Sequence, residues 1–323
     1  MSVSVSSSHA RALLMLLLAT AFWGVSFPLM KALGQLAHQV SPDAGTWYFT
    51  SMMLMPRFVL AAVVIGLVMG RGVREITRNE WYQGACIGGF AAAGMLFQAD
   101  GLQFTEASTS AFLTQLYAIL IPLWVAWRSR RNPGARVWVC TAMVLAGVAI
   151  LGQFDWRALR LGRGEAETLL ASFFFMGQIL TLERKQFALN RVLPITFVMF
   201  LVEGIVFGGL AWATAPDLAA FTGVASKPAW WVLTGALTVF CTLGAFLLMN
   251  KWQPKISSTE AGLLYCGEPI FSSVFSLFLP GWFSVMAAIE YPNEGITTQL
   301  LIGGGLISVA NILLQLRRSK QPN

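Results

Sequence analysis

Long apolar stretches alternate with short polar connections along the whole chain. A membrane-spanning α-helix needs about 20 mostly apolar residues, and ten stretches of the chain have about that length and character. The predicted spans are residues 12–33, 48–70, 82–104, 107–127, 136–153, 166–183, 194–214, 229–250, 257–280 and 296–316. The pattern therefore predicts an all-α integral membrane protein with ten transmembrane helices and little mass outside the bilayer.

The composition agrees with this prediction and argues against other classes of protein. Of the 323 residues, 56% are hydrophobic and 11% are charged, against roughly 25% charged residues in an average soluble protein. The first apolar run resembles a signal peptide as far as Ala21, but it continues through "FWGVSFPLM", which favours an uncleaved first span. Two histidines and four dispersed cysteines argue against a metal site, and we expect no cofactor.

Positive charges are distributed unevenly between the connections. With the N-terminus placed in the cytoplasm, 16 of the 22 Lys and Arg residues fall in cytoplasmic segments and five in external ones. This bias predicts that both termini are cytoplasmic in a plasma membrane, which is the inner membrane if the source is bacterial. The net charge of +7 then reflects this topology and contact with anionic lipid, and we expect no nucleic-acid partner.

Segments of the two halves of the chain resemble each other. "LQFTEASTSAFL" (102–113) aligns with "WQPKISSTEAGL" (252–263), and "FWGVSFPLMK" (22–31) aligns with "FMGQILTLER" (175–184) at nearly the same offset. Five spans in each half is an odd number, so the second half enters the membrane from the opposite side. The sequence thus predicts two inverted five-helix repeats, residues 1–153 and 154–323, an architecture common in secondary transporters.

Four motifs carry a family resemblance across nearly the whole chain. They are "FWGVSF" (22–27), "ASTSAFLTQLYAILIPLWVAW" (107–127), "EAGLLYCGEPIF" (260–271) and "NEGITTQLLIGGGLI" (293–307). They resemble EamA-type members of the drug/metabolite transporter superfamily, although Glu294 precedes Gly295 where the family has the reverse order. The resemblance implies alternating access around a central cavity lined mainly by spans 1, 3, 4, 6, 8 and 9. It also implies transport of metabolites, with amino-acid export among the known activities.

Charged residues inside the predicted spans are costly, so each needs a partner or a water-filled cavity. The candidates are Arg57, Asp100, Glu106, Glu203, Glu260 and Glu268. Glu106 and Glu260 lie near helix starts, where a carboxylate suits the helix dipole. Arg57 can either pair with Asp100 or Glu203 or hold a substrate carboxylate, and the sequence leaves both open.

The stretch "YCGEPIF" (265–271) contains the main candidates for coupling. Pro269 interrupts the helical hydrogen bonding of the ninth span, and the corresponding fourth span contains Pro122. Broken helices in corresponding positions of two repeats point to a binding site. Glu268 either satisfies neighbouring polar groups or sets the charge of the site and exchanges protons. We assign Glu268, Pro269 and Arg57 to gating or coupling.

The expected cavity wall combines polar and aromatic side chains from five spans. It contains Trp23, Gln98, Thr114, Tyr117, Gln178, Tyr265 and Glu268. Such a wall suits amino acids or similar amphipathic compounds better than phosphorylated ones, which need several buried Lys or Arg residues. The predicted function is secondary active transport of small metabolites, in the direction of efflux. The substrate, the coupling ion and the oligomeric state stay open.

Three other functions compete with this prediction. A passive facilitator or channel is the nearest alternative, and the sequence does not exclude it. A membrane-embedded enzyme is disfavoured because no nucleophile–base pair or metal cluster is visible and both histidines lie outside the spans. A purely structural membrane protein is disfavoured by the carboxylates and broken helices inside the spans.

Overall fold

A computed structural model of the protein describes residues 2–101, 103–104, 110, 113–130, 132–151 and 162–315. These residues form helices joined by short connections, and none of them lies in a β-strand. Glu106, the start of the fourth predicted span and the ends of the fifth and tenth spans lie outside the described residues. The expected all-helical fold is confirmed for the described part of the chain.

The first half of the chain forms helices in the order of the predicted spans. They are α1 (Ser2–Val40), α2 (Thr46–Met69), the short η1 (Gly70–Glu75), α3 (Arg78–Gly101), α5 (Tyr117–Ser129) and α6 (Ala135–Leu151). The first helix is longer than its predicted span at both ends, because polar residues continue the helix beyond the apolar run. Proline does not end it, since Pro28 lies inside the helix.

The second half contains shorter and more interrupted helices. They are α7 (Arg163–Leu182), η2 (Lys185–Phe187), α8 (Val192–Thr214), α9 (Leu218–Ala225), α10 (Pro228–Ala236), η3 (Leu237–Gly244), α11 (Ala245–Trp252), η4 (Gln253–Lys255), α12 (Ser258–Tyr265), α13 (Glu268–Ser276), α14 (Leu279–Ala287) and α15 (Thr298–Gln315). The eighth predicted span is one continuous helical stretch, α10 to α11, with a π-helical segment in its middle. The short α9 lies between the seventh and eighth predicted spans and was not predicted.

Length and apolar composition identify fewer membrane spans than ten. Among the described residues, four helical stretches qualify: Ser8–Val40, Thr46–Glu75, Val192–Thr214 and Pro228–Lys255. A fifth qualifies if Ser258–Ser276 and Leu279–Ala287, which meet at a bend of 60°, count as one span. The helices α6 and α15 are apolar but shorter. These findings fit a multi-pass membrane protein, whereas ten crossings in two repeats are not confirmed.

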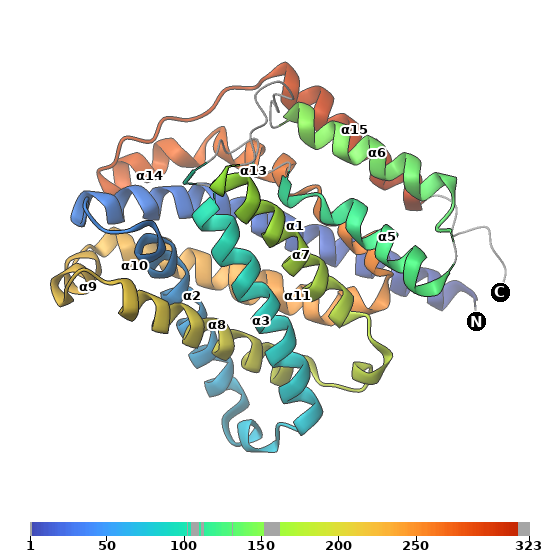
Figure 1. Ribbon diagram of the computed structural model, residues 1–323, viewed down its shortest axis with the longest axis horizontal. Coiled ribbons are helices and arrows are strands. Elements are labelled where there is room, and N and C mark those ends of the chain that lie inside the picture. The colour runs from blue at the N-terminus through green and yellow to red at the C-terminus, as the bar shows by residue number, and fades with distance from the viewer. Residues whose placement is uncertain are drawn as a thin grey trace.

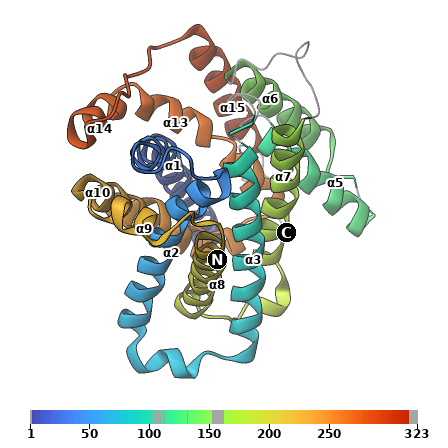
Figure 2. The same cartoon turned by 60° about the vertical axis from the view of Figure 1, so that its left-hand side comes forward.

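The helix α1 lies inside the bundle and positions much of the site. Figure 2 looks nearly along α1 and shows α2, α10 and α13 around it, and the packing of α1 also includes α11. Figure 1 shows α6 and α15 paired at the edge of the bundle. The helix α3 packs between α7 and α8. At Gly88 it approaches α8 so closely that a Cβ atom there would lie 2.8 Å from the carbonyl oxygen of Met199.

Candidate functional site

One cavity, of about 100 Å³, lies among α1, α2, α3, α7, α11 and the α12–α13 break. All seven side chains expected at the cavity wall line it, from Trp23 on α1 to Glu268 at the start of α13. Arg57 on α2 lines it too. Pro269, which we expected to act in gating, is not part of the lining. The role of these residues in binding stays a prediction, because their position alone does not test it.

The broken ninth span delivers two of these residues to the cavity. The helix α12 ends at Tyr265, and α13 begins at Glu268 with Pro269 in its first turn. Proline is favoured there because its missing N–H has no helical partner in a first turn, and a carboxylate suits the positive end of the helix dipole. The Glu-Pro pair therefore starts a new helix, whereas the sequence suggested a defect inside one.

The aromatic wall is held in place by a chain of hydrogen bonds and ring contacts. The Tyr265 hydroxyl donates to Oε1 of Gln253 over 3.0 Å, and Nε2 of Gln253 donates to the carbonyl oxygen of Ile179 over 2.8 Å. The Trp23 ring meets the rings of Tyr265 and Phe246 edge-on, with centroids 5.2 and 5.4 Å apart. These contacts fix the orientation of the rings before any ligand enters.

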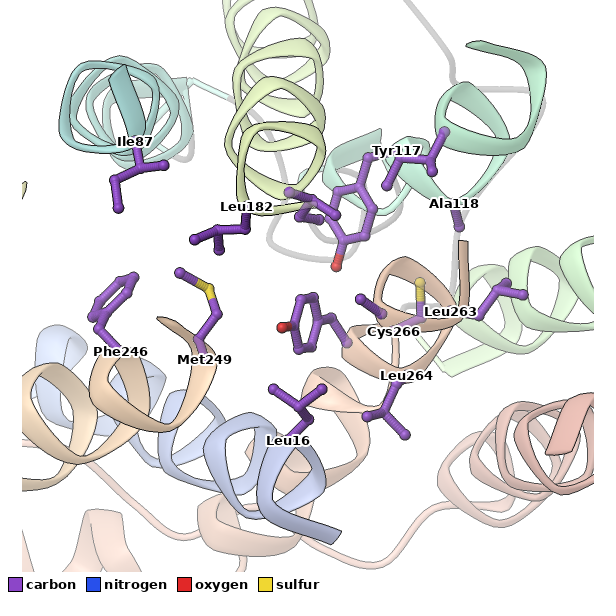
Figure 3. Close-up of a cluster of buried hydrophobic side chains, with 14 of the residues drawn as sticks. Leu16, Ile87, Tyr117, Ala118, Leu182, Phe246, Met249, Leu263, Leu264 and Cys266 are labelled. Carbon is purple, nitrogen blue, oxygen red and sulfur yellow. The ribbon is translucent and has the colours of Figure 1, made fainter. Parts of the chain in front are cut away.

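The opposite wall comes from α3 and the fourth predicted span. Nε2 of Gln98 donates to Oγ1 of Thr114 over 3.3 Å, and Tyr117, the first residue of α5, is buried beside it. Figure 3 shows Tyr117 facing the same apolar interior as Phe246 and Met249 of α11. The two segments that the sequence paired as repeat counterparts thus face each other through Tyr117 and Tyr265, both of which line the cavity.

Several hydrogen-bond donors at the cavity have no acceptor among the described residues. They are Nε1 of Trp23, Nε of Arg57 and Nε2 of Gln178, all of which are buried atoms. An unpaired buried donor costs about 1–3 kcal/mol. Such donors are therefore the groups that a ligand with acceptor atoms can satisfy.

The charged residues of the spans differ in whether they have partners among the described residues. Asp100 is buried and forms an ion pair with Arg163 of α7, so Asp100 is not the partner of Arg57, one of the alternatives that the sequence left open. Glu203 is fully buried, and neither of its carboxylate oxygens has a hydrogen-bond partner in the described part of the chain. Glu260 closes a capping box with Ser257 at the start of α12, which confirms its expected role at a helix start.

Two ion-pair clusters tie α3 to the second half of the chain. At its first turn, Glu80 accepts hydrogen bonds from Nε and Nη2 of Arg191 over 2.8 and 3.0 Å and from the backbone N–H of Thr77 over 2.8 Å. The Arg191 guanidinium lowers the pKa of Glu80 to about 2. At the other end, Arg163 bridges Asp100 and Glu167. Sequence reasoning missed both clusters, because Glu80, Arg163 and Arg191 read as ordinary charges of the connections.

Sequence reasoning also missed part of the cavity lining. Phe246 and Met249 of α11 line the cavity, and Gln253 holds Tyr265 from behind. The spacing of three residues between Phe246 and Met249 places both on one helix face, which is the signal that could have found them. Among the described residues, no group of three or more His, Cys, Asp or Glu side chains is placed to hold a metal ion.

Comparisons with known proteins find similarity over most of the chain. The chain is 24% identical over 304 residues to an uncharacterized transporter of Archaeoglobus fulgidus, an alignment that covers 94% of this chain and 85% of the relative. A crystal structure of another protein, 17% identical, superimposes with a TM-score of 0.66 over 97% of this chain and 100% of that one. At this identity the superposition shows a shared fold only.

A family comparison covers the first half of the chain. Residues 10–153 match the model of the EamA-like transporter family. This range contains the motifs of the first and fourth predicted spans, and it includes Trp23, Arg57 and Tyr117 of the cavity. The resemblance read from the sequence is therefore confirmed: over residues 10–153 this chain matches the EamA-like transporter family, which is consistent with the drug/metabolite transporter superfamily.

Proposed function

We propose that the protein is a secondary active transporter that exports amino acids or similar small amphipathic metabolites. The family match and the transporter-named relative support a membrane transporter. The observation that carries the finer proposal is the cavity, because helices from both halves of the chain line it and one of them is broken at the lining residue Glu268. Alternating access requires such a site between two bodies that can change their relation.

The packing of the helices supports two inverted repeats, residues 1–153 and 154–323. A pseudo-two-fold axis that relates five-span repeats exchanges each span with the span five places later. The second and seventh predicted spans, α2 and α8, pack against each other, as do the fifth and tenth, α6 and α15. The contact of α3 with α7 has its expected counterpart in the contact of α11 with α1. This pattern is what an axis between the halves requires.

We further propose ten membrane crossings, with both termini in the cytoplasm of a plasma membrane. The uneven distribution of Lys and Arg supports this orientation. Fusion of alkaline phosphatase, which is active only outside the cytoplasm, to successive connections tests it. Alternating activity across nine connections is the expected result, and an active fusion at the C-terminus would overturn the orientation.

Counterflow in proteoliposomes tests transport itself. Vesicles that hold the purified protein are loaded with a concentrated amino-acid mixture and diluted into labelled amino acids. A carrier accumulates label transiently above equilibrium, because bound substrate returns with each cycle, whereas a passive channel gives no overshoot. Absence of an overshoot for every solute that crosses would favour the facilitator.

Glu268→Gln tests proton coupling in the same vesicles. The uncharged side chain keeps the size of Glu268 but exchanges no proton, so we expect transport that is lost or no longer responds to an imposed pH gradient. Glu294→Gln, in the exposed connection before α15, is the matched control and should behave as the wild type. If Glu268→Gln transports at the wild-type rate and responds to the pH gradient as the wild type does, Glu268 has no role in proton coupling, and the transporter proposal is unaffected.

A further inference from the structure

Arg57 is a buried cation without a direct anionic partner. Arg57 is 3% exposed, and no carboxylate of the described residues lies within ion-pair distance of its guanidinium group. Its Nη1 reaches only the sulfur of Met30, at 3.7 Å, and its Nε has no acceptor. In contrast, Arg163 and Arg191 are half-exposed and fully engaged with carboxylates. Arg57 therefore has the least water and the weakest partners of these three arginines.

Arg57 has acidic neighbours but no counter-charge in direct contact among the described residues. Glu203 of α8 is the acidic residue whose charge acts on Arg57, and the thiol of Cys241 in η3 is the other titratable neighbour. Neither carboxylate oxygen of Glu203 accepts a hydrogen bond from the described residues. Arg57 lines the cavity, whereas Glu203 does not. The guanidinium thus lines the cavity without a carboxylate in direct contact, and its Nε is an unpaired donor among the described residues.

The neighbours of Arg57 in the cavity lining add donors of the same kind. Nε1 of Trp23 and Nε2 of Gln178 are buried, line the same cavity and have no acceptor among the described residues. An arginine with two further donors is suited to a planar anion with two acceptor oxygens. A single cation matches one negative charge, so a carboxylate fits this site better than a phosphate.

The cavity also holds one carboxylate that Arg57 does not neutralise. Glu268 lines it from the start of α13, and no basic side chain of the described residues pairs with it. Separate positive and negative groups in one small cavity favour a ligand that carries both charges over a ligand with two negative charges.

We infer that Arg57 is the specificity-determining residue that binds the carboxylate of the transported substrate, with Trp23 and Gln178 as additional donors. The inference rests on the proposed transport function, and it deepens it by assigning the substrate class to carboxylates that carry at most one net negative charge. It resolves the two roles that the sequence left open for Arg57 in favour of substrate binding.

Matched pairs of acids and amides test this inference directly. The probes are the twenty common L-amino acids and their carboxamides, and binding is measured by the rise in melting temperature of the detergent-purified protein with ligand concentration. We expect at least one acid to bind about tenfold or more tightly than its amide. Arg57→Gln should weaken the binding of that acid by about 30-fold or more and should change the binding of the amide by less than threefold.

Three further variants make the result unambiguous. Arg163→Gln removes an arginine outside the cavity and should leave the preference for acids unchanged. Arg57→Lys keeps the charge but loses the forked donors, so it should retain part of the preference. If Arg57→Gln does not fold because buried Glu203 loses its neighbouring cation, the double variant Arg57→Gln/Glu203→Gln removes both ionisable groups and is expected to fold without acid binding.

Three outcomes would overturn the inference. They are equal binding of acids and amides by the wild type, equal loss of both in Arg57→Gln, and the failure of every acid to bind. Each is separate from the transport proposal, because counterflow of any solute by the wild type would still show a carrier. Conversely, an acid preference that depends on Arg57 without any counterflow would support the binding site and reject transport.

Discussion

The two ends of α3 are joined to the second half of the chain in different ways. At the first turn, the buried carboxylate of Glu80 accepts from two guanidinium nitrogens and the backbone N–H of Arg191, as well as from the backbone of Thr77. At the last turn, Asp100 has one ion-paired oxygen, while its other buried oxygen has no partner among the described residues. Both carboxylate oxygens of Glu80 therefore have hydrogen-bond donors, whereas only one carboxylate oxygen of Asp100 has a partner among the described residues.

Neighbouring side chains increase this difference. Beside Glu80, Asn79 donates to Asn190, and Asn190 donates in turn to Gln83 over 2.8 Å. Beside Asp100, the same Arg163 is shared with Glu167 and lies over the Phe104 ring at 4.1 Å. The Glu80 end therefore holds more of the polar contact energy between α3 and the rest of the bundle. The Asp100 end is therefore the easier one to separate.

The largest expected effect follows from Glu80→Gln. The amide cannot accept all the charged donors of Arg191, so we expect a loss of about 2 kcal/mol in stability at neutral pH. The folded pKa of about 2 lies below the ordinary 4.5, so the stabilisation is complete above pH 4.5 and is lost as the pH falls towards 2. Thermal unfolding in detergent across this range should show wild type and variant converging at low pH; a constant difference would contradict the assignment.

A second, smaller effect distinguishes Gly88→Ala from Gly94→Ala. A Cβ at Gly88 would meet the backbone of α8, 2.8 Å from the Met199 carbonyl oxygen, whereas at Gly94 it would meet the ring of Phe175 at 2.7 Å. A ring can turn but a packed backbone cannot, so we expect about 1–2 kcal/mol for Gly88→Ala and less for Gly94→Ala. Because Phe175 lines the cavity, Gly94→Ala should alter ligand binding instead. Equal melting temperatures of the two variants, together with unchanged ligand binding by Gly94→Ala, would contradict this explanation.

The smallest expected effect is that of Asp100→Asn. Arg163 keeps Glu167 as a carboxylate partner, and the pair is half-exposed on the arginine side, so we expect a stability loss of about 1 kcal/mol or less. The loss should shrink in high salt, because the charge of a half-exposed arginine is screened by salt. Unfolding curves at low and high salt measure this, and a loss larger than that of Glu80→Gln would reverse the comparison.

The sequence predicted well those features that depend on spacing along one helix. The helix positions and the internal repeat predicted a cavity lined by Trp23, Gln98, Gln178 and Glu268. The structure brings these four side chains together around one cavity. The break near Pro269 was also visible, since proline removes a backbone donor. The sequence did not show that one helix ends and another begins at this break. The structure shows α12 ending at Tyr265 and α13 starting at Glu268.

Features that depend on how helices rotate against one another were not predictable. The periodicity of α2 gives a face for Arg57 but does not say whether Asp100 or Glu203 will meet it. Asp100 instead pairs with Arg163, a residue that the sequence assigns to a connection. The 60° bend before α14 was missed for a similar reason. A straight helix and a bent helix can have the same run of apolar residues, so the sequence pattern does not distinguish them.

The contact between α1 and α13 has a mechanical consequence. Gly24 brings the two backbones so close that an added Cβ would lie 2.5 Å from Cβ of Phe271. Trp23 stands next to this contact, and Glu268 stands one turn before it on α13. We therefore expect α1 and α13 to move together, so that Trp23 and Glu268 keep nearly the same separation. Movement of the other helices that line the cavity, α2, α3, α5, α7, α11 and α12, would then be what changes its size.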